Sequence, residues 1–327
     1  MKLSDFDYTL PEELIAQEPI SPRDHSRLMV LNSRIEHKHF YNIIDYLKKG
    51  DVLVINETKV EHAKITGIKQ TGTKVELIAV KVLGDRCRCR LKTKNPKPGN
   101  RLIFGKFIGT IVEQEGEEFI VEFNKDVNYI LKKIGELPTP SYIKKKLEKD
   151  SQYQTVYSKK LGSMAAPTAG LHFTKGLLKK IEDKGVKIAK VTLHVDFGTF
   201  LPVRDIKKKT LHREYFEIDE KNADIINKRK GKLIVVGTTS VRALESVADK
   251  HGKIAAKTGT TELFIKPGYR FKTKIDAMIT NFHLPKSTLL MLVSAFFGRK
   301  KILDAYKVAI KKRYRLFSFG DAMLILK

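Results

Sequence analysis

The chain has no tryptophan and only two cysteines, Cys87 and Cys89, among its 327 residues. One residue separates the two cysteines, and such positions on a strand lie too far apart for an unstrained disulfide. The second cysteine pair that a structural zinc site would need is missing as well. We therefore expect two reduced thiols on one face of a strand, and no metal site.

Long apolar runs are also missing. The longest, residues 289–297, is interrupted by Ser294 and is about half as long as the ~20 residues that a membrane span needs. Residues 1–7 are acidic where a signal peptide is basic, and they lack its apolar core. These features predict a soluble, cytoplasmic protein that does not contact a membrane.

Neither a Gly-x-Gly dinucleotide fingerprint nor a phosphate-binding P-loop occurs in the chain. Both motifs bring backbone N–H groups against phosphates. Their absence argues against nicotinamide-dependent enzymes, NTPases and methyltransferases of the Rossmann type.

Acidic residues are few compared with basic ones. The 37 Asp and Glu stand against 63 Lys and Arg, which gives a formal charge of +26 and a pI of about 9.8. Such an excess indicates an anionic partner, most often a nucleic acid. Enzymes of acidic substrates and membrane-surface proteins can also be basic, and a lysine-rich genome produces the same excess. Basic runs that can follow a phosphate backbone occur at residues 144–146, 207–209, 228–232 and 311–313.

The pattern of the chain changes twice, which predicts two domains. Short alternating strands separated by turns fill the middle, whereas helices alternate with strands on either side. We expect a mixed α/β core domain of residues 1–62 and 152–327, interrupted by an inserted all-β, barrel-like domain of residues 63–151. The inserted strands are expected at 74–82, 87–92, 101–104, 107–113 and 119–123. The core is expected to contain strands at 52–55, 186–195 and 233–236, and helices at 41–49, 175–183, 241–249, 287–296 and 302–312.

Three segments of the core domain are candidates for a site. The first, residues 165–173, consists of small residues and turn formers followed by His172 and Phe173, just before a helix that Thr174 can cap. Small residues let the backbone approach a ligand closely, and loops between framework elements often carry sites. A tight structural turn with a buried histidine explains the same pattern.

The second segment follows an apolar strand and opens a helix with Gly237, Thr238, Thr239, Ser240 and, after Val241, Arg242. Unpaired N–H groups, hydroxyls and the positive end of a helix suit a carboxylate or a phosphate, and a guanidinium can add a bidentate clamp. An ordinary N-cap is the alternative explanation.

The third segment, residues 280–287, is polar, contains Phe282, His283 and Pro285, and leads into a helix that is apolar on all sides. A helix of that kind is buried, so the segment before it is expected near the interior. His283 is therefore either an acid/base group with a shifted pKa or a core histidine with satisfied hydrogen bonds.

A series of short motifs runs along almost the whole chain. They are residues 4–8 (SDFDY), 14–17 (LIAQ), 22–28 (PRDHSRL), 50–60 (GDVLVINETKV), 153–157 (YQTVY), 165–173 (AAPTAGLHF), 192–195 (TLHV), 198–200 (GTF), 237–242 (GTTSVR), 261–265 (TELFI), 267–269 (PGY), 280–290 (TNFHLPKSTLL) and 320–324 (GDAML). In this order they resemble the S-adenosylmethionine:tRNA ribosyltransferase-isomerases of queuosine biosynthesis. The chain departs from that pattern at Lys64, where the family usually has arginine, at Asp196 and Phe197, and in an insertion without tryptophan.

The resemblance implies an enzyme that transfers and isomerises the ribosyl part of S-adenosylmethionine. The acceptor is 7-aminomethyl-7-deazaguanine in the anticodon loop of tRNA, and the products are epoxyqueuosine, adenine and methionine. S-adenosylmethionine is then a consumed cosubstrate, so no cofactor is expected, and we expect a monomer. The alternatives are another S-adenosylmethionine-dependent tRNA-modifying enzyme, such as a methyltransferase, or a non-catalytic RNA-binding protein.

The implied chemistry suggests roles for the candidate residues. A methionine carboxylate suits Gly237, Thr238, Thr239, Ser240 and Arg242, and the sulfonium suits the aromatic faces of Phe173, Phe282 and Tyr269. His283 and His172 are the candidate general bases, with His283 preferred because the apolar helix behind it should keep its loop away from bulk water. We expect a pKa near neutral for that base. Glu262 and Asp321 are candidates to hold the cationic aminomethyl group.

Overall fold

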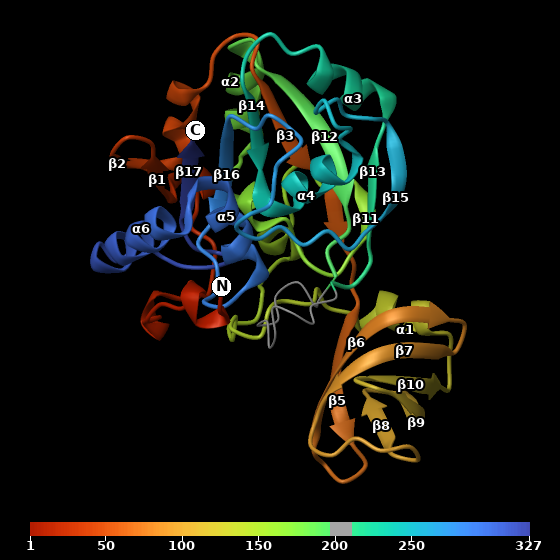
Figure 1. The fold of residues 1–327 in the computed structure, drawn as a ribbon. Coiled ribbons are helices and arrows are strands. Elements are labelled where there is room, and N and C mark those ends of the chain that lie inside the picture. The colour runs from red at the N-terminus through yellow and green to blue at the C-terminus, as the bar shows by residue number, and fades with distance from the viewer. Residues whose placement is uncertain (197–210) are drawn as a thin grey trace. The chain divides into compact units, whose positions relative to one another are not determined.

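The computed structural model describes residues 1–196 and 211–327 and separates the chain into two compact units (Figure 1). The larger unit comprises Met1–Lys59 and Pro140–Lys327, and the smaller unit is Val60–Thr139. The mixed α/β fold with an inserted closed β-barrel that the sequence predicts is confirmed.

A nine-stranded mixed sheet forms the centre of the larger unit, in the order β15-β13-β12-β3-β14-β16-β17-β1-β2. The strands β12, β3, β14 and β16 are parallel neighbours, whereas β17 and β1 run in the opposite direction. The strands of this sheet are β1 (Arg27–Leu31), β2 (Ile35–His39), β3 (Val52–Asn56), β12 (Lys187–Leu193), β13 (Glu214–Ile218), β14 (Leu233–Val236), β15 (Lys257–Thr261), β16 (Ala277–Asn281) and β17 (Ala322–Leu326). A separate two-stranded sheet pairs β4 (Thr58–Val60) with β11 (Lys160–Ser163).

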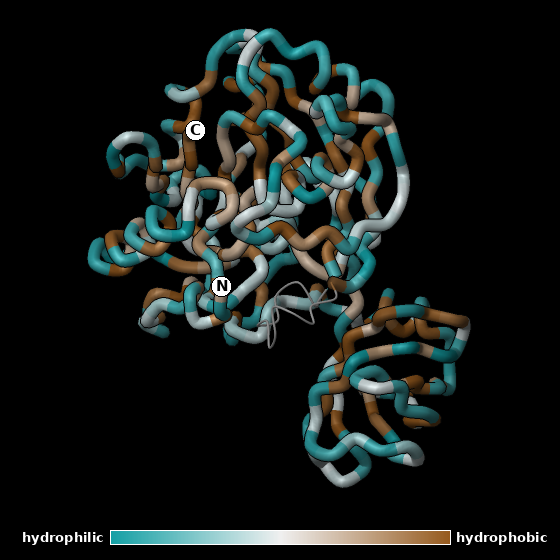
Figure 2. The backbone as a smooth tube through the Cα atoms, in the orientation of Figure 1, coloured by the Kyte–Doolittle hydropathy of each residue, from teal (hydrophilic) through white to brown (hydrophobic). Residues whose placement is uncertain are grey.

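Both faces of the large sheet are buried. Val52 and Val54 of β3 belong to one hydrophobic cluster, and Leu53 and Ile55 belong to another, because successive side chains of a strand point to opposite faces. Helices α3 (Glu220–Asn227), α4 (Gly237–Val247), α5 (Thr288–Phe297) and α6 (Arg299–Lys311) contribute to the first cluster. Helix α2 (Lys175–Asp183) contributes to the second. Burial on both sides explains why the central strands are continuous apolar runs, which are brown in Figure 2.

Local sequence signals set the ends of two helices. The Thr174 side chain accepts a hydrogen bond from the backbone N–H of Leu177 at 3.1 Å and so caps α2, as predicted. Ser287 caps α5 in the same way, through the N–H of Leu290. After α2 the chain turns at Gly185, whose φ of +85° is a backbone conformation that favours glycine.

The smaller unit is a closed barrel of six antiparallel strands in the order β10-β7-β6-β5-β8-β9. Its strands are β5 (Lys64–Lys69), β6 (Lys74–Leu83), β7 (Arg86–Lys92), β8 (Arg101–Phe104), β9 (Phe107–Glu115) and β10 (Glu118–Phe123), and helix α1 (Val127–Ile134) follows them. Cys87 and Cys89 are free, fully buried thiols on the same face of β7, as expected. The Cys87 thiol and burial raise the pKa of Cys89, so this thiol is unreactive.

The structure differs from the sequence expectation at several boundaries. The compact inserted unit ends at Thr139, next to the prolines at 138 and 140, whereas the domain division expected from the sequence extends the insertion to residue 151. The segment after Thr139 packs on the larger unit: Gln17 Nε2 donates to the Tyr142 carbonyl at 2.9 Å, and Gln17 Oε1 accepts from Lys144 N at 2.8 Å. The helix expected at 41–49 is a 3₁₀-helix over Phe40–Tyr46, and α4 begins four residues earlier than expected.

Within the described ranges, no helix combines the length and the apolar character that crossing a bilayer requires.

The inserted unit has its own closed strand order and its own core, so we predict that it folds alone. A fragment of residues 60–139 should unfold in one cooperative thermal transition followed by circular dichroism. Gly67→Ala should lower its stability by about 1–3 kcal/mol, because an added Cβ would collide with the Ile103 carbonyl and the Phe104 ring. The exposed neighbour Thr66→Ala is the control and should have a smaller effect. A fragment without a cooperative transition would show that the unit needs the rest of the chain.

Candidate active site

Polar segments meet at one edge of the large sheet. Strands β3, β14 and β16 are parallel and end there at Asn56, Val236 and Asn281, and the segments that precede β17 and β1 reach the same edge because those strands run the other way. In open α/β sheets, the carboxyl ends of parallel strands are the usual place for ligands. This edge of the sheet is therefore the expected place for a ligand-binding site.

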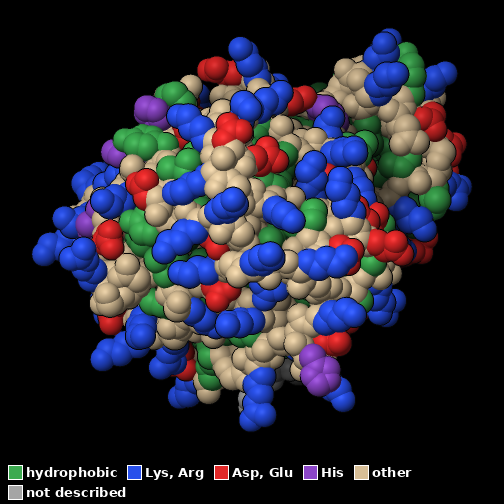
Figure 3. Space-filling model, turned by 90° about the horizontal axis from the view of Figure 1, so that it is seen from above, with side chains coloured by type: hydrophobic (Ala, Val, Ile, Leu, Met, Phe, Trp, Pro, Cys, Tyr) green, Lys and Arg blue, Asp and Glu red, His purple; other side chains and the backbone are tan. Residues whose placement is uncertain are grey.

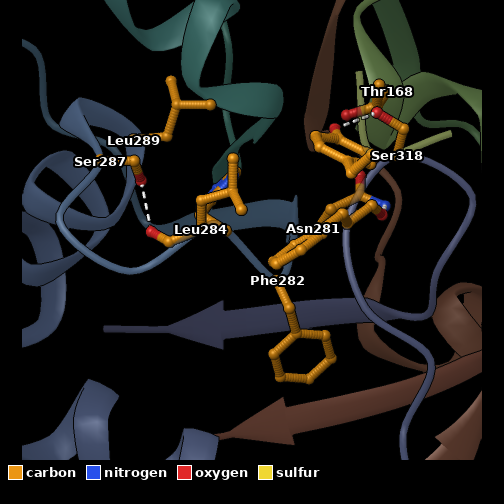
Figure 4. A pocket seen from close by; sticks show the side chains of 10 residues that line it. Thr168, Asn281, Phe282, Leu284, Ser287, Leu289 and Ser318 are labelled. Carbon is orange, nitrogen blue, oxygen red and sulfur yellow. Dashed lines mark hydrogen bonds between the residues drawn. The ribbon is translucent and has the colours of Figure 1, made fainter. Parts of the chain in front are cut away.

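Two adjoining hollows open at this edge. The α4 hollow, of about 360 Å³, is lined by Ala166, Pro167, Thr168, Ala169, Val195, Gly237, Thr238, Thr239, Thr280, Asn281, His283 and Leu289. The Phe317 hollow, of about 340 Å³, is lined by Tyr142, Thr168, Asn281, Phe282, His283, Leu284, Ser287, Leu289, Phe317 and Ser318 (Figure 4). Because Thr168, Asn281, His283 and Leu289 line both, the two hollows are neighbours, and we refer to them together as the cleft. All three segments singled out in the sequence contribute to it.

The start of α4 supplies a positive helix end to this cleft. Gly237 has a φ of +83°, and a Cβ there would lie 3.7 Å from the Ala169 side chain. Thr239 Oγ1 accepts a hydrogen bond from Asn56 Nδ2 at 3.3 Å, which connects the helix start to the end of β3. Gly237, Thr238 and Thr239 line the α4 hollow, whereas the Ser240 hydroxyl points back and donates to the Val236 carbonyl. The sequence predicts an anion at the N–H groups of this first turn, and this stays a prediction.

Arg242 does not line either hollow. Its guanidinium forms a buried ion pair with Glu214, and its Nε donates to the Leu263 carbonyl at 2.9 Å. The clamp that the sequence suggested would need this guanidinium at the cleft, but Glu214 holds it elsewhere. Removal of one partner from a buried ion pair leaves an uncompensated charge, so loss of either Arg242 or Glu214 alone should be strongly destabilising.

His172 is buried, and neighbours occupy both of its ring nitrogens. Its Nδ1 lies 2.7 Å from Ser26 Oγ, its Nε2 lies 3.2 Å from Asn281 Nδ2, and its ring stacks on Phe40. Burial lowers the pKa of His172 to about 3, so the imidazole is neutral at pH 7. The residue lines a separate hollow of about 230 Å³ with Arg23 and is absent from the cleft. This geometry leaves no ring nitrogen free to act as a base.

His283 lines both hollows and keeps one ring nitrogen available. Its Nε2 lies 2.8 Å from Thr280 Oγ1, and no described side chain or backbone group bonds its Nδ1. Its backbone is held by Tyr306, which accepts from the N–H at 2.8 Å, and by Tyr8, which donates to the carbonyl at 2.6 Å. Burial lowers the pKa of His283 to about 3. The near-neutral pKa expected from the sequence is therefore wrong for the free protein, although a neutral imidazole able to accept a proton is present.

Of the aromatic candidates for the sulfonium, only Phe282 borders the cleft. Its ring extends away from Ser287 and Leu289 (Figure 4) and packs edge-on against Tyr306 and Tyr314. Phe173 is fully buried against Phe40 in the second hydrophobic cluster. Tyr269 is half-buried and donates its hydroxyl to Glu245 at 3.0 Å. The two latter rings are therefore parts of the packing.

The two acidic candidates lie outside the cleft. Glu262 is exposed and pairs with Arg213 at 2.8 Å. Asp321 is buried, and its carboxylate accepts from the backbone N–H groups of Arg27 and Arg315 at 2.9 and 2.8 Å. Asp321 thus holds together the chain at the start of β17 and β1. Over the described part of the chain, no group of three or more His, Cys, Asp or Glu is placed to hold a metal ion.

Several cleft residues were not singled out from the sequence. Asn281 and Thr280 belong to a candidate segment, and their place at the end of an apolar strand was the available signal. Tyr142 and Ser318 carry no local signal, because they join the cleft through a hydrogen bond of 2.8 Å between segments 176 residues apart. The motif at residues 198–200, the departure at Phe197 and the basic run 207–209 lie outside the described residues.

The surface carries the basic excess broadly. Lys and Arg side chains spread across the face drawn in Figure 3, with fewer Asp and Glu among them. The lysines of the described basic runs 144–146, 228–232 and 311–313 are exposed. An extended anionic partner such as RNA would be attracted to this kind of surface.

The two buried histidines make stability depend on pH. Their folded-state pKa of about 3 lies below the ordinary value of 6.5, so the unfolded chain binds more protons. The part of the free energy of unfolding that these two neutral histidines contribute is therefore complete above about pH 6.5, and it is lost as the pH falls toward 3. Between pH 7.5 and pH 5 we expect the free energy of unfolding to fall by about 2 kcal/mol for each histidine, measured by urea denaturation.

The matched comparison is His172→Gln, which removes one of the two contributions and should flatten the pH dependence. His251→Gln, at an exposed histidine, is the control. A pH dependence of His172→Gln as steep as that of the wild type would contradict the burial argument.

Comparison with known proteins identifies the family. The family model described as Queuosine biosynthesis protein matches residues 3–325. A protein of Acetivibrio thermocellus named S-adenosylmethionine:tRNA ribosyltransferase-isomerase is 51% identical over 341 residues, covering 99% of this chain and 100% of that protein. A protein of the same name from Fusobacterium nucleatum is 51% identical over 339 residues, covering 99% and 96%. The crystal structure of a Thermotoga maritima S-adenosylmethionine tRNA ribosyltransferase is 36% identical, covers 99% of this chain and 100% of that one, and has a TM-score of 0.58. The chain therefore belongs to the queuosine biosynthesis protein family, the family that its motifs predicted.

Proposed function

We propose that this protein transfers the ribosyl part of S-adenosylmethionine to 7-aminomethyl-7-deazaguanine in the anticodon loop of tRNA. Rearrangement of the ribosyl ring then gives epoxyqueuosine and releases adenine and methionine. The observation that carries this proposal is the convergence of three family motifs on one cleft, at the carboxyl edge of the sheet. Membership of a family whose named relatives are ribosyltransferase-isomerases supports it.

The cleft offers complementary groups to S-adenosylmethionine. In this proposal, the methionine carboxylate lies at the first turn of α4, where Gly237, Thr238 and Thr239 line the wall. The anion is held by backbone N–H groups and the helix end, without Arg242. In this proposal, the exposed lysine runs attract the phosphate backbone of the tRNA. We also propose that the protein acts as a monomer in the cytoplasm, without a cofactor or a metal ion.

His283 is the proposed general base. The carbon that joins the ribose to sulfur must lose a proton: the C–H bond breaks, its electron pair stays on the carbon beside the sulfonium, and the proton passes to the free Nδ1. The low pKa of about 3 in the free protein makes this imidazole a weak base. A carboxylate bound nearby at α4 and the phosphates of bound RNA would favour the protonated form and raise its basicity.

The products test the proposed function directly. Incubation of the protein with S-adenosylmethionine and a tRNA that carries the deazaguanine precursor should release adenine and methionine in equal amounts. S-adenosylhomocysteine in their place would instead identify a methyltransferase, and unconsumed S-adenosylmethionine would identify an RNA-binding protein.

His283→Gln tests the general base. We expect binding of S-adenosylmethionine and of tRNA to persist while adenine release in a single turnover falls by about 10²-fold or more, the scale of a lost general base. His251→Gln, at an exposed residue that does not line the cleft, should react as the wild type does. Deuterium at the ribose carbon attached to sulfur should slow the wild-type reaction if that step limits the rate. Near-normal adenine release by His283→Gln would eliminate this histidine as the base.

A further inference from the structure

The amide of Asn281 has a fixed orientation at the centre of the cleft. The residue is 1% exposed, and its Nδ2 donates to the Phe317 carbonyl at 3.0 Å and approaches His172 Nε2 at 3.2 Å. Because a carbonyl oxygen only accepts, the nitrogen of the amide must be the atom beside Phe317. The amide oxygen Oδ1 therefore occupies the other side, and it is buried without a hydrogen-bond partner.

His172 contacts the nitrogen of this amide and so helps to fix its orientation. Since Asn281 Nδ2 is a donor, His172 Nε2 must accept, and its proton lies on Nδ1, which donates to Ser26 Oγ at 2.7 Å. The stacking of the ring on Phe40 restricts its rotation. Ser26, His172 and Asn281 thus form one buried chain of hydrogen bonds that ends at an unused oxygen.

An unpaired, buried amide oxygen needs an explanation, because nearly all buried polar atoms in folded proteins have a partner. Asn281 lines both hollows, and it lies between the Leu284 and Leu289 side of the cleft and the Thr168 and Ser318 side (Figure 4). A ligand in the cleft with an N–H or O–H group would supply the missing donor.

The chemistry of the lining indicates which donor this is. No Asp or Glu is among the described residues that line the two hollows, so a cationic group bound there meets only neutral oxygens. The α4 hollow also contains Gly237, Thr238 and Thr239, the proposed carboxylate site. In an α-amino acid the ammonium is one carbon away from the carboxylate. The acceptor for that ammonium should therefore lie in the same hollow as the helix end, as Asn281 does.

We propose that Asn281 Oδ1 accepts a hydrogen bond from the α-ammonium group of S-adenosylmethionine, and that His172 is the positioning residue that aims this oxygen. The inference rests on the proposed function, since it takes S-adenosylmethionine as the ligand. It assigns to His172 a role in substrate recognition through Asn281 in place of proton transfer.

The test compares two ligands on the intact protein by calorimetry. One is S-adenosylmethionine, and the other is the sulfonium analogue with a 3-carboxypropyl chain, which lacks only the amino group. The wild type should prefer S-adenosylmethionine by about tenfold to a hundredfold, the scale of one charge-assisted hydrogen bond. Asn281→Ala should bind the two ligands equally and should bind the analogue as the wild type does.

Matched variants separate recognition from folding. Leu289→Val changes an apolar side chain that lines the same two hollows. It should lower the affinity for both ligands alike and keep the preference for S-adenosylmethionine. Asn281→Asp keeps the shape. A carboxyl that burial keeps protonated can donate to the Phe317 carbonyl and leave its other oxygen as the acceptor, so this variant should keep the preference even if the alanine variant fails to fold. His172→Phe keeps the aromatic stacking but removes the acceptor for Asn281 Nδ2, and it should reduce the preference without changing the affinity for the analogue.

Each remaining outcome overturns the proposal. If Asn281→Ala binds both ligands as the wild type does, Oδ1 is not the ammonium acceptor. If His172→Phe does so, His172 does not position this oxygen. If Asn281→Ala keeps the preference and loses affinity only for tRNA with the deazaguanine precursor, the donor belongs to the nucleobase. A wild type that binds both ligands without preference overturns this inference alone, whereas a wild type that binds neither overturns the proposed function with it.

Discussion

Burial of both faces of the central sheet is the constraint on which the rest of this structure depends. Strands such as β3 and β14 have no polar face, so they can be stable only between two layers of helices and loops. Four neighbouring strands then run parallel, and their polar continuations must all leave the sheet at the same edge. The cleft is a consequence of this arrangement, because the chain changes from buried strand to loop or helix several times within a small region.

The same constraint brings polar groups into the interior at that edge, and side-chain hydrogen bonds compensate for their burial. Asn56 Oδ1 accepts from the N–H groups of Thr58 and Leu193, each at 3.1 Å, and so joins the ends of β3 and β12. Glu245 accepts from the N–H groups of Lys272 and Thr273 in the same manner. Such groups are costly to bury unpaired, so their networks hold the loops in defined positions. Asn281 Oδ1 lacks such a partner, as do the buried atoms Arg242 Nη2 and Thr273 Oγ1.

The basic excess acts on a different scale from these contacts. Its lysines are spread over exposed positions, where single charges contribute little to folding stability. A field of one sign instead raises the rate at which an anionic partner is encountered, and it is screened by salt. In the proposed function, specific recognition of the substrate would therefore depend on the neutral, buried groups of the cleft, whereas attraction of the RNA would depend on the surface.

Elements whose signals are local were predictable from the amino-acid sequence. The alternation in residues 74–123 was sufficient to place β6 to β10, and the apolar run 233–236 coincides with β14. The segments 237–242 and 280–287 were recognisable as candidate site segments, because in each of them small and polar residues follow an apolar strand. Edge strands such as β2, which is mostly exposed, have no comparable pattern and were missed.

The partner of each polar side chain, in contrast, depends on the packing of the whole fold. Arg242 faces Glu214, Asp321 faces Arg27 and Arg315, and Asn281 faces Phe317 and His172, and most of these pairs are far apart in sequence. A guanidinium or a carboxylate has the same local signature whether it binds a ligand or another side chain. Which of the two it does is decided by the packing of distant segments, since burial removes water and leaves each polar atom dependent on the partners that the fold brings within reach.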